Sequence, residues 1–314
     1  MTRTACPDPR QRGVALITAL VVVAIAAGIA VAIAWQTNLD TRRTSNLVQG
    51  DQAMEYALGA EAWAEEILAR DGRKSQGVTA LNQDWAQQLP PLPVDGGQIQ
   101  GKIEDLQGRF NINSLAAGQG QNPAQALQQF QRLLQAVGQD PTLASAVAQW
   151  FTSTPGGAVD ASDDYYSRLQ PPYLTGGPGT SMQSVSELLL VKGITPAVYA
   201  QIFPYVCALP NQGAAIPINI NTASGPVLES LNENVTADIA SQVIGERGST
   251  ALNGAPPQAF TAANIPATGF GYDSSYFLVT VVAQIGSTHV TLYSLLYRNG
   301  NNEVTAVRRT LGTL

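Results

Sequence analysis

The stretch Gly13-Val14-Ala15-Leu16-Ile17-Thr18 opens an apolar run that reaches Trp35 without a charged side chain. At a rise of about 1.5 Å per residue, a helix over 14–35 would be about 33 Å long, enough to cross a hydrocarbon core of roughly 30 Å. Arginines precede the run at positions 3, 10 and 12, and such residues stay on the cytoplasmic side. The sequence therefore predicts one transmembrane helix at 14–35, with the remainder of the chain across the membrane.

A cleaved secretory signal peptide is the competing interpretation of this segment. The apolar region of a signal peptide usually has roughly 7–15 residues and is followed by a cleavage site between small residues. The run that ends at Trp35 is longer, and no clear site of this kind follows before Trp35. We therefore expect the apolar helix to stay in the mature protein.

Composition limits the classes of function. Only 13% of the 314 residues are charged, 45% are hydrophobic, and the formal net charge is -6. A nucleic-acid-binding protein normally carries a basic surface for phosphates, so this balance argues against one. Two cysteines, Cys6 and Cys207, and the single His289 are too few for a cysteine-rich metal site or a Ser-His-Asp triad. We expect Cys207 to be a small buried side chain and His289 an ordinary strand residue, and we predict no enzyme.

Helical spacing continues beyond Trp35. Small and aliphatic side chains recur every three or four positions, at Ala53, Ala57, Ala60, Ala64, Ile67 and Leu68. Asp71-Gly72 supplies a stop signal, so we predict one helix over about 14–70 whose second half packs on a globular head. Residues 72–95 contain three prolines and are predicted to form a loop, whereas alternation over 98–103 predicts a first strand.

The remainder of the chain changes character once. Residues from about 108 to 265 are predicted to be mainly helix and loop, with capping residues at Asn122, Asp140, Ser184, Thr195 and Thr236. The tail then alternates with a period of two, and turn residues separate three predicted strands, Tyr276–Ile285, His289–Arg298 and Val304–Leu311. This order predicts an α+β head whose sheet is interrupted by an insertion.

Three internal segments, taken in order, resemble the K pseudopilin family (general secretion pathway protein K, GspK). They are Asp105-Leu106-Gln107-Gly108-Arg109-Phe110-Asn111-Ile112-Asn113, Ser184-Val185-Ser186-Glu187-Leu188-Leu189-Leu190-Val191-Lys192-Gly193 and Ile218-Asn219-Ile220-Asn221-Thr222-Ala223. At the start of the chain, Gln11-Arg12-Gly13-Val14 resembles a type IV prepilin leader, which a prepilin peptidase cuts after the glycine. The resemblance covers nearly the whole chain.

The resemblance implies how the amino terminus is processed. It implies cleavage after Gly13 and methylation of the new amino group on Val14. Thr18 then becomes position five of the mature chain, where most relatives carry a glutamate that pairs with the amino terminus of a neighbouring subunit. The K family lacks this glutamate, so the resemblance makes Thr18 an assembly residue.

The resemblance also implies a type IV pilin-like fold. In this α+β fold a long N-terminal helix packs on an antiparallel sheet, here with a large, mainly helical insertion. The expected divisions are a leader at 1–13, the transmembrane helix at 14–35, a pilin-like part at 36–107, the inserted domain at 108–265 and the last strands of the sheet at 266–314.

In function, the resemblance implies a non-enzymatic minor pseudopilin at the tip of the type II secretion pseudopilus. Such a subunit supports pseudopilus assembly and protein export across the outer membrane, with the I-type and J-type minor pseudopilins as partners. It would span the inner membrane once and place its C-terminal head in the periplasm. A tip position agrees with Thr18, because a subunit with no neighbour above it needs no carboxylate there.

A membrane-anchored DNA-uptake or periplasmic binding protein is the alternative function. Leu189–Ile194 also resembles a helix-hairpin-helix unit, and Ile220–Ala223 resembles the entry to such units in DNA-uptake proteins. In the DNA-binding versions, hairpin amides and basic side chains cradle a phosphate. Between 184 and 248, however, two basic residues accompany five acidic ones, a net charge of 2 − 5 = −3. This charge argues against nucleic acid as a partner.

Asp160, Asp163 and Asp164 form the candidate metal site, in a polar stretch of the insertion. Clustered carboxylates supply the hard oxygen ligands that calcium prefers, and the resemblance implies calcium because family members bind it in the inserted domain. The spacing does not follow the EF-hand pattern, and Gln149-Trp150-Phe151 lacks the aspartates that the family carries there. A solvated acidic loop is therefore the other interpretation, and both stay open.

Overall fold

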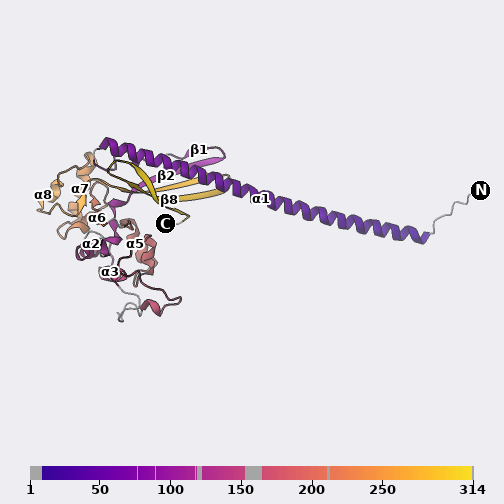
Figure 1. Cartoon of the computed structure of the whole chain (residues 1–314), viewed down its shortest axis with the longest axis horizontal. Coiled ribbons are helices and arrows are strands. Elements are labelled where there is room, and N and C mark those ends of the chain that lie inside the picture. Colours follow the sequence, from indigo (N-terminus) through magenta and orange to yellow (C-terminus); the bar gives the residue numbers. More distant parts are fainter. Residues whose placement is uncertain are drawn as a thin grey trace, which may run out of the picture.

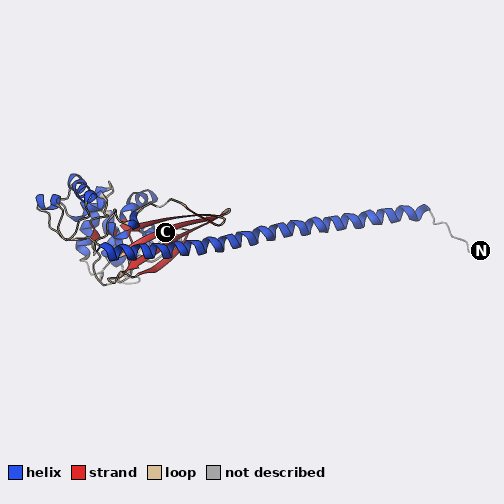
Figure 2. Cartoon of the chain, turned by 90° about the horizontal axis from the view of Figure 1, so that it is seen from above, coloured by secondary structure: helices blue, strands red, loops and turns tan. Residues whose placement is uncertain are grey.

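The computed structural model describes residues 9–75, 77–88, 90–116, 118, 122–152, 165–210 and 213–312. A single helix, α1 (Pro9–Ser75), extends far beyond the rest of the molecule. Figures 1 and 2 show, in two perpendicular views, that the head gathers around the last part of this helix. Every residue from 14 to 48 is exposed, so the free part of α1 has no packing within the chain.

The second half of α1 packs on the sheet of the head. Ala53, Ala57, Ala64 and Leu68 are buried in one hydrophobic cluster with residues of the strands. These positions follow the three- and four-residue spacing of one helix face, and the small alanines let the helix lie close to the sheet. The predicted packing of this half on a globular head is confirmed.

The predicted end of α1 at Asp71-Gly72 is wrong, because the helix continues to Ser75. Asp71 is buried, and its carboxylate accepts a hydrogen bond from the backbone N–H of Trp85 at 2.9 Å. At Gly72, a Cβ atom would collide with the side chain of Asn302, so the glycine provides space for a neighbouring turn. Both residues thus serve tertiary contacts, and neither ends the helix.

Five of the described strands form an antiparallel sheet in the order β1-β2-β7-β8-β9. The strands are β1 (Leu92–Val94), β2 (Gly97–Asp105), β7 (Tyr276–Ile285), β8 (Thr288–Arg298) and β9 (Val304–Leu311). The contacts of α1 with the sheet are mainly with β7 and β8. The first strand and the three C-terminal strands lie where the sequence predicts them, and β8 begins one residue earlier than expected, at Thr288.

Residues 92–94 form a strand although the sequence predicts a loop over 72–95. Leu92 is paired with Ile99, and Pro93 with Gln98, at the edge of the sheet. A proline removes one backbone donor, which an edge strand tolerates because its outer side has no partner. The proline-rich segment therefore ends in an edge strand, and the loop prediction is wrong for these three positions.

An ion pair with a buried carboxylate ties the last strand to α1. Glu61 is buried, and its carboxylate accepts hydrogen bonds from Nη2 of Arg309 on β9 at 2.7 Å and from Nε at 3.0 Å. The hydroxyl of Ser294 on β8 also contacts Glu61. Three elements, α1, β8 and β9, thus meet at one carboxylate.

A mainly helical unit is inserted between β2 and β7. Its α-helices are α2 (Pro123–Ala136), α3 (Leu143–Thr152), α5 (Pro196–Ile202), α6 (Gly225–Leu231), α7 (Ala237–Ser249) and α8 (Gln258–Ala262). Short 3-10 helices are η2 (Leu106–Gly108), η3 (Ile112–Leu115), η4 (Val185–Leu190) and η5 (Phe203–Tyr205), and η1 (Asp84–Ala86) lies before the sheet. Two short parallel pairs join β3 (Phe110–Asn111) to β4 (Val206–Cys207) and β5 (Ile218–Asn219) to β6 (Phe270–Gly271).

Most of the predicted caps begin a helix. The side chains of Asn122, Thr195 and Thr236 each accept a hydrogen bond from a backbone N–H in the first turn of α2, α5 and α7. Ser184 and Glu187 form the expected capping box, which starts the 3-10 helix η4. Asp140 is the exception, because its carboxylate accepts from Thr142 and α3 begins only at Leu143.

The carboxyl end of the insertion lies later than predicted. The expected border after residue 265 would assign β6 (Phe270–Gly271) to the pilin-like sheet. Instead β6 pairs with β5 inside the insertion, and the five-stranded sheet resumes only at Tyr276. Two-residue strands carry too little alternation to be assigned to a sheet from sequence.

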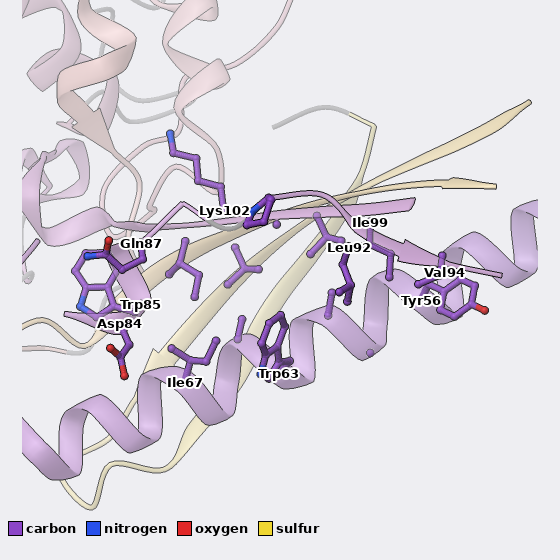
Figure 3. Close-up of a pocket in the computed structure, with 18 of the residues that line it drawn as sticks. Tyr56, Trp63, Ile67, Asp84, Trp85, Gln87, Leu92, Val94, Ile99 and Lys102 are labelled. Atoms are coloured by element: carbon purple, nitrogen blue, oxygen red, sulfur yellow. The ribbon is translucent and has the colours of Figure 1, made fainter. Parts of the chain in front are cut away.

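A groove of about 390 Å³ is open between α1 and the edge of the sheet (Figure 3). Trp63 and Ile67 line it from the helix, and Trp85, Leu92 and Ile99 line it from the opposite side. Most of its lining is apolar.

Candidate assembly site

The residues predicted for processing and assembly lie on the free part of α1. Gly13 and Val14 are inside the helix, and Val14 is 63% exposed. Thr18 lies one turn further, and its hydroxyl donates to the carbonyl oxygens of Val14 at 3.1 Å and Ala15 at 3.0 Å. Position 18 is therefore uncharged, and its polar group is satisfied within its own helix, as an apolar environment requires.

The free part of α1 has the properties of a membrane anchor. Its most apolar window has a mean hydropathy of 2.9, and none of that window is buried in the chain. A helix of this length and composition fits a single-pass anchor that carries a soluble head.

The predicted metal ligands Asp160, Asp163 and Asp164 lie outside the described residues. Within the described part of the chain, no three side chains of the types His, Cys, Asp or Glu are grouped as metal ligands would be. Calcium binding stays a prediction.

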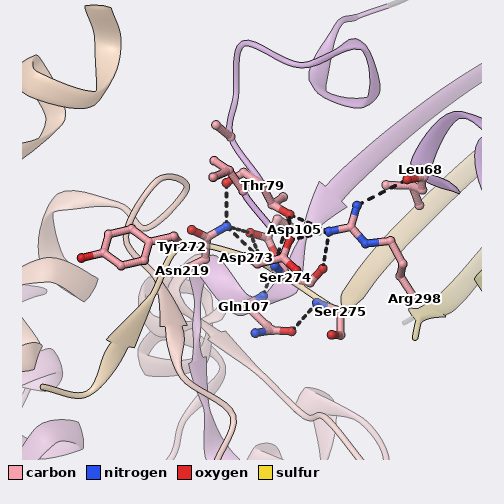
Figure 4. Close-up of polar contacts among 12 residues, drawn as sticks. Leu68, Thr79, Asp105, Gln107, Asn219, Tyr272, Asp273, Ser274, Ser275 and Arg298 are labelled. Atoms are coloured by element: carbon pink, nitrogen blue, oxygen red, sulfur yellow. Dashed lines mark hydrogen bonds and ion pairs between the residues drawn. The ribbon is translucent and has the colours of Figure 1, made fainter. Parts of the chain in front are cut away.

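Two of the sequence motifs meet at the junction between the sheet and the insertion (Figure 4). Asp105, the last residue of β2, is buried, and its Oδ2 accepts hydrogen bonds from Nδ2 of Asn219 at 2.9 Å and from the hydroxyl of Thr222 at 2.5 Å. Ser274 donates to the same oxygen at 2.7 Å, and the N–H of Gln107 donates to Oδ1 at 2.8 Å. One carboxylate thus holds four donors, two from the ends of the insertion and two from the 218–223 motif in its interior.

The paired asparagines of the motifs organise the insertion itself. Asn113 is fully buried and exchanges hydrogen bonds with the backbone of Met182 in both directions, at 2.7 and 2.9 Å. Its amide also donates to the carbonyl oxygen of Leu209. Asn221 has the corresponding role in the second half, where it accepts from the N–H of Leu252 at 2.8 Å and donates to its carbonyl oxygen. These amides replace missing backbone partners in loops that are buried.

Arg298 extends the junction to α1. Its Nη2 atom donates to Asp273 at 2.6 Å, to the hydroxyl of Thr79 at 2.7 Å and to the carbonyl oxygen of Ser274 at 2.8 Å. Nη1 donates to the carbonyl oxygen of Leu68 in α1 at 3.3 Å. Figure 4 shows Arg298 reaching from β8 into this network, between Leu68 and the residues around Asp105. The guanidinium therefore connects the helix, the sheet and the carboxyl end of the insertion.

Burial controls the electrostatics of the junction. Loss of solvent raises the pKa of Asp105 above its usual value of 3.8, and the hydrogen bonds from Thr222, Ser274, Gln107 and Asn219 oppose this only in part. Four donors of the same chain occupy the carboxylate of Asp105. The site is a structural junction.

The hairpin that resembles a phosphate-binding unit is engaged within the chain. The backbone N–H of Lys192 donates to the hydroxyl of Tyr166 at 3.0 Å, and the ammonium group of Lys192 lies 4.8 Å from the centre of the Tyr165 ring. In the turn between α6 and α7, the N–H of Asn234 donates to the side chain of Asn232. The geometry thus adds to the charge argument against a phosphate ligand.

Cys207 and His289 have the ordinary roles predicted for them. Cys207 is buried in the junction between β4 and the sheet, and loss of solvent raises the pKa of its thiol to about 12. His289 is an exposed residue of β8. Neither side chain has the surroundings of a reactive group.

Sequence reasoning missed most of the junction. Thr79, Asp273, Ser274 and Arg298 belong to no motif that was singled out, and their partners are more than twenty residues away in sequence in most cases. Asp105, Gln107, Asn219 and Thr222 carried a signal, through the two motifs that contain them. An isolated arginine at the end of a strand gives no indication that it is buried.

The exposed apolar helix, the antiparallel sheet packed on its second half and the helical insertion define a membrane-anchored subunit with a type IV pilin-like fold. Comparison with known proteins identifies the subunit. Two family models, both described as Type II secretion system (T2SS), protein K, match this chain, one over residues 108–211 and the other over residues 218–263. The chain is 32% identical to Type II secretion system protein K of Aeromonas hydrophila, over 96% of this chain and 98% of that one.

Two further relatives agree. The chain is 34% identical to Type II secretion system protein K of Pectobacterium carotovorum subsp. carotovorum, over 96% of this chain and 97% of the relative. It is 31% identical to the protein of that name from Pseudomonas aeruginosa, over 96% and 93%. The chain belongs to the type II secretion system protein K family, and it is therefore a minor pseudopilin of type II secretion.

A solved structure supports the fold. A chain of the crystal structure of the GspK-GspI-GspJ complex from the enterotoxigenic Escherichia coli type 2 secretion system has a TM-score of 0.68 to this one. The match covers 87% of this chain and all of that chain, at 23% identity. The predicted pilin-like α+β fold is confirmed.

Replacement of Asp105 tests the junction. We expect Asp105→Ala to lower the free energy of unfolding by about 3 kcal/mol, because it leaves buried donors without an acceptor. Since the pKa of Asp105 is raised in the folded chain, wild-type stability should fall as the pH rises from about 3.8 to that raised pKa. The isosteric Asp105→Asn protein should lack this part of the pH dependence.

The measurement is urea unfolding of the detergent-solubilised chain, followed by circular dichroism at several pH values. An unchanged midpoint for Asp105→Ala, or a difference between wild type and Asp105→Asn that does not vary with pH, would contradict this account of the junction.

Proposed function

We propose that this minor pseudopilin occupies the tip of the type II secretion pseudopilus, where it supports pseudopilus assembly and protein export across the outer membrane. The observation that carries the proposal is the division of α1 into a fully exposed apolar half and a half packed on the head. The exposed half suits packing with lipid and with equivalent helices of other subunits, while the head remains in water.

Two features support the tip position. Thr18 offers no charge, and its hydroxyl is occupied by the carbonyl oxygens of Val14 and Ala15, so it cannot neutralise the amino terminus of a subunit above it. The insertion lies at the end of the molecule opposite to the free end of α1 (Figure 1). A large unit there obstructs the stacking of a further subunit.

The same geometry supports a non-enzymatic role and a periplasmic head. The buried carboxylate of Asp105 accepts hydrogen bonds from the Thr222 and Ser274 hydroxyls, the Asn219 amide and the backbone of Gln107, so these groups serve to hold the insertion on the sheet. Arginines at 3, 10 and 12 precede the apolar run, and by the positive-inside rule they hold the amino terminus in the cytoplasm. The head then follows across the inner membrane.

The proposed partners are the I-type and J-type minor pseudopilins. The structural neighbour was solved as a complex named GspK-GspI-GspJ, and that chain shares the fold described above. Prepilin peptidase is the proposed processing enzyme, cutting after Gly13 and methylating Val14.

Co-purification tests the assembly. We expect the full chain, co-expressed in the inner membrane with the I-type and J-type pseudopilins of the same secretion system and extracted in detergent, to bring both partners through affinity and size-exclusion steps. Elution of the chain alone, with both partners expressed, would argue against the proposed tip complex.

Substitution of Gly13 tests processing. In the native envelope, intact-mass measurement of the wild type should show a chain that begins at methylated Val14. Gly13→Leu should retain residues 1–13, because a bulky side chain blocks access of the peptidase to the bond. Gly28→Leu is the matched control, since it makes the same change in the exposed helix at a position where a Cβ meets nothing within 4 Å. A wild-type chain that keeps Met1 would contradict the leader.

Isothermal titration tests the metal prediction. We propose that Asp160, Asp163 and Asp164 bind calcium, which three carboxylates within one short stretch favour. Calcium added to the chelator-treated chain should release or absorb heat with a saturable isotherm, and Asp160→Asn with Asp163→Asn should remove it. Asp51→Asn serves as the control, because Asp51 lies on α1. If calcium added to the wild-type chain gives no heat of binding, the calcium proposal is wrong and these residues form a solvated acidic loop.

A further inference from the structure

The groove between α1 and the edge of the sheet, here called the α1–β2 groove, has three sides. One wall is α1, with Tyr56, Gly59 and Trp63. The other wall is formed by Asp84, Trp85, Gln87, Pro90, Leu92 and Val94. The floor consists of Ile99, Gly101 and Ile103 of β2 with Val279 and Val281 of β7. Its volume of about 390 Å³ holds a few large side chains, and nothing in the described chain fills it.

Two glycines line this groove, and no contact or backbone conformation within the described chain requires glycine at either position. Gly59 lies in the middle of α1 and Gly101 in the middle of β2, and a Cβ atom at either would meet nothing within 4 Å. Neither has the left-handed backbone that favours glycine. Glycine weakens the interior of both helices and strands, and in a strand it marks places where another backbone approaches closely. The two glycines therefore point to a second polypeptide at this groove.

Large apolar side chains stand at the mouth of the groove. Trp63 on α1 and Leu92 on β1 are each 51% exposed. Figure 3 shows Trp63 on the helix side, with Leu92 and Ile99 on the side of the strands. Along β2, Gly101 lies between Ile99 and Ile103 on the same face of the strand. Because glycine has no side chain, this position leaves a hole in the floor of the groove. Tryptophan beside a hole of this kind is typical of the centre of an interface.

Acidic side chains gather near one end of the groove, where Glu55 lines it and Asp51 and Asp95 lie outside its lining. Asp51 and Glu55 lie one turn apart on α1, and the side chain of Gln52 between them donates to the carbonyl oxygen of Asp95 at 3.3 Å. This contact brings the β1–β2 turn beside the helix. Among the ion pairs of the described residues, none includes Asp51, Glu55 or Asp95, whereas Asp84 at the other end is paired with Arg70. The free carboxylates call for a basic partner.

The shape of the groove suits a bound helix better than a strand added to the edge of the sheet. Beyond β1, the outer side of β2 from Lys102 to Asp105 faces Leu81, Trp85 and Ala86, which line a second hollow there. These residues obstruct the addition of a strand to the edge. The straight wall of α1, with a glycine at its centre, instead allows a second helix to approach closely.

We infer that the α1–β2 groove binds an α-helix of a neighbouring pseudopilin. Apolar side chains on one face of that helix enter the groove between Gly59 and Gly101, and lysine or arginine at one end lies against Asp51, Glu55 and Asp95. The inference rests on the proposed function, since it assigns the surface through which this subunit holds a partner of the tip complex.

Matched glycine substitutions in the full chain test the inference. Gly59→Leu fills the groove, yet the free chain has space for the new side chain, and leucine is the better helix former. Gly245→Leu in α7 is the control, because Gly245 also lies in a helix and its Cβ would meet nothing within 4 Å. In co-purification with the I-type and J-type pseudopilins, Gly59→Leu should lower partner recovery at least about tenfold, and Gly245→Leu should leave it unchanged.

A second variant makes the result independent of any defect in α1. Gly101→Val fills the floor of the groove from β2, where a β-branched residue suits a strand, and should cause the same loss. Thermal unfolding of each variant should match or exceed that of the wild type. Asp51→Lys with Glu55→Lys should also weaken recovery, through repulsion of the basic end of the partner.

Cross-linking identifies the occupant. A photoreactive phenylalanine at exposed position Ala62 should capture a helical peptide that contains lysine or arginine. Capture of a non-helical segment, or undiminished recovery of both partners by Gly59→Leu and Gly101→Val, would overturn the inference while the complex itself stands. If the wild type recovers neither partner, the proposed tip complex fails and the inference fails with it.

Discussion

A helix satisfies its own backbone hydrogen bonds in any surroundings. This property lets the single helix α1 have an exposed apolar half and a half that packs on the head. From 14 to 48 every side chain is exposed, and the apolar ones dominate as far as Trp35. From Ala53 onward, one face carries small alanines against the sheet while the other face stays in solvent. The sheet and the groove are built on this second half, and the insertion is in turn held to the sheet, so their placement depends on the helix remaining unbroken.

The insertion is tolerated because a small number of buried polar groups hold it to the pilin-like part. Asp105 and Arg298 lie on β2 and β8, and each contacts residues at the carboxyl end of the insertion. Arg298 also reaches Leu68 of α1. Buried polar groups of this kind are costly when unpaired, so they select one relative placement of the two units more sharply than apolar packing does. A head that must present fixed surfaces to neighbouring subunits benefits from that rigidity.

The junction and the α1–β2 groove differ in how their charged side chains are paired and in how well their space is filled. At the junction, opposite charges are paired and satisfied, as with Arg298 and Asp273. At the α1–β2 groove, Glu55 has no such partner in the described chain and lies beside exposed Trp63 and an unfilled floor. An apolar surface bordered by unpaired charge is typical of a site that another protein covers. The free half of α1 and this groove are continuous along one helix, so anchoring and partner binding share a single element.

The sequence by itself determined the elements whose signals are local. The apolar run from Val14, the caps at Asn122, Thr195 and Thr236 and the alternation of the last three strands each depend on neighbours within a few residues. The three ordered motifs likewise indicated the family, and the polar Thr18 in place of an acid agreed with it. Only the tertiary structure decided where α1 ends, because Asp71 is satisfied by Trp85 in a distant turn. It also decided that Asp105 and Arg298 are buried, that β6 pairs within the insertion, and that Gly59 and Gly101 line the same groove. Those outcomes depend on atoms far apart in the chain, whose proximity no local pattern encodes.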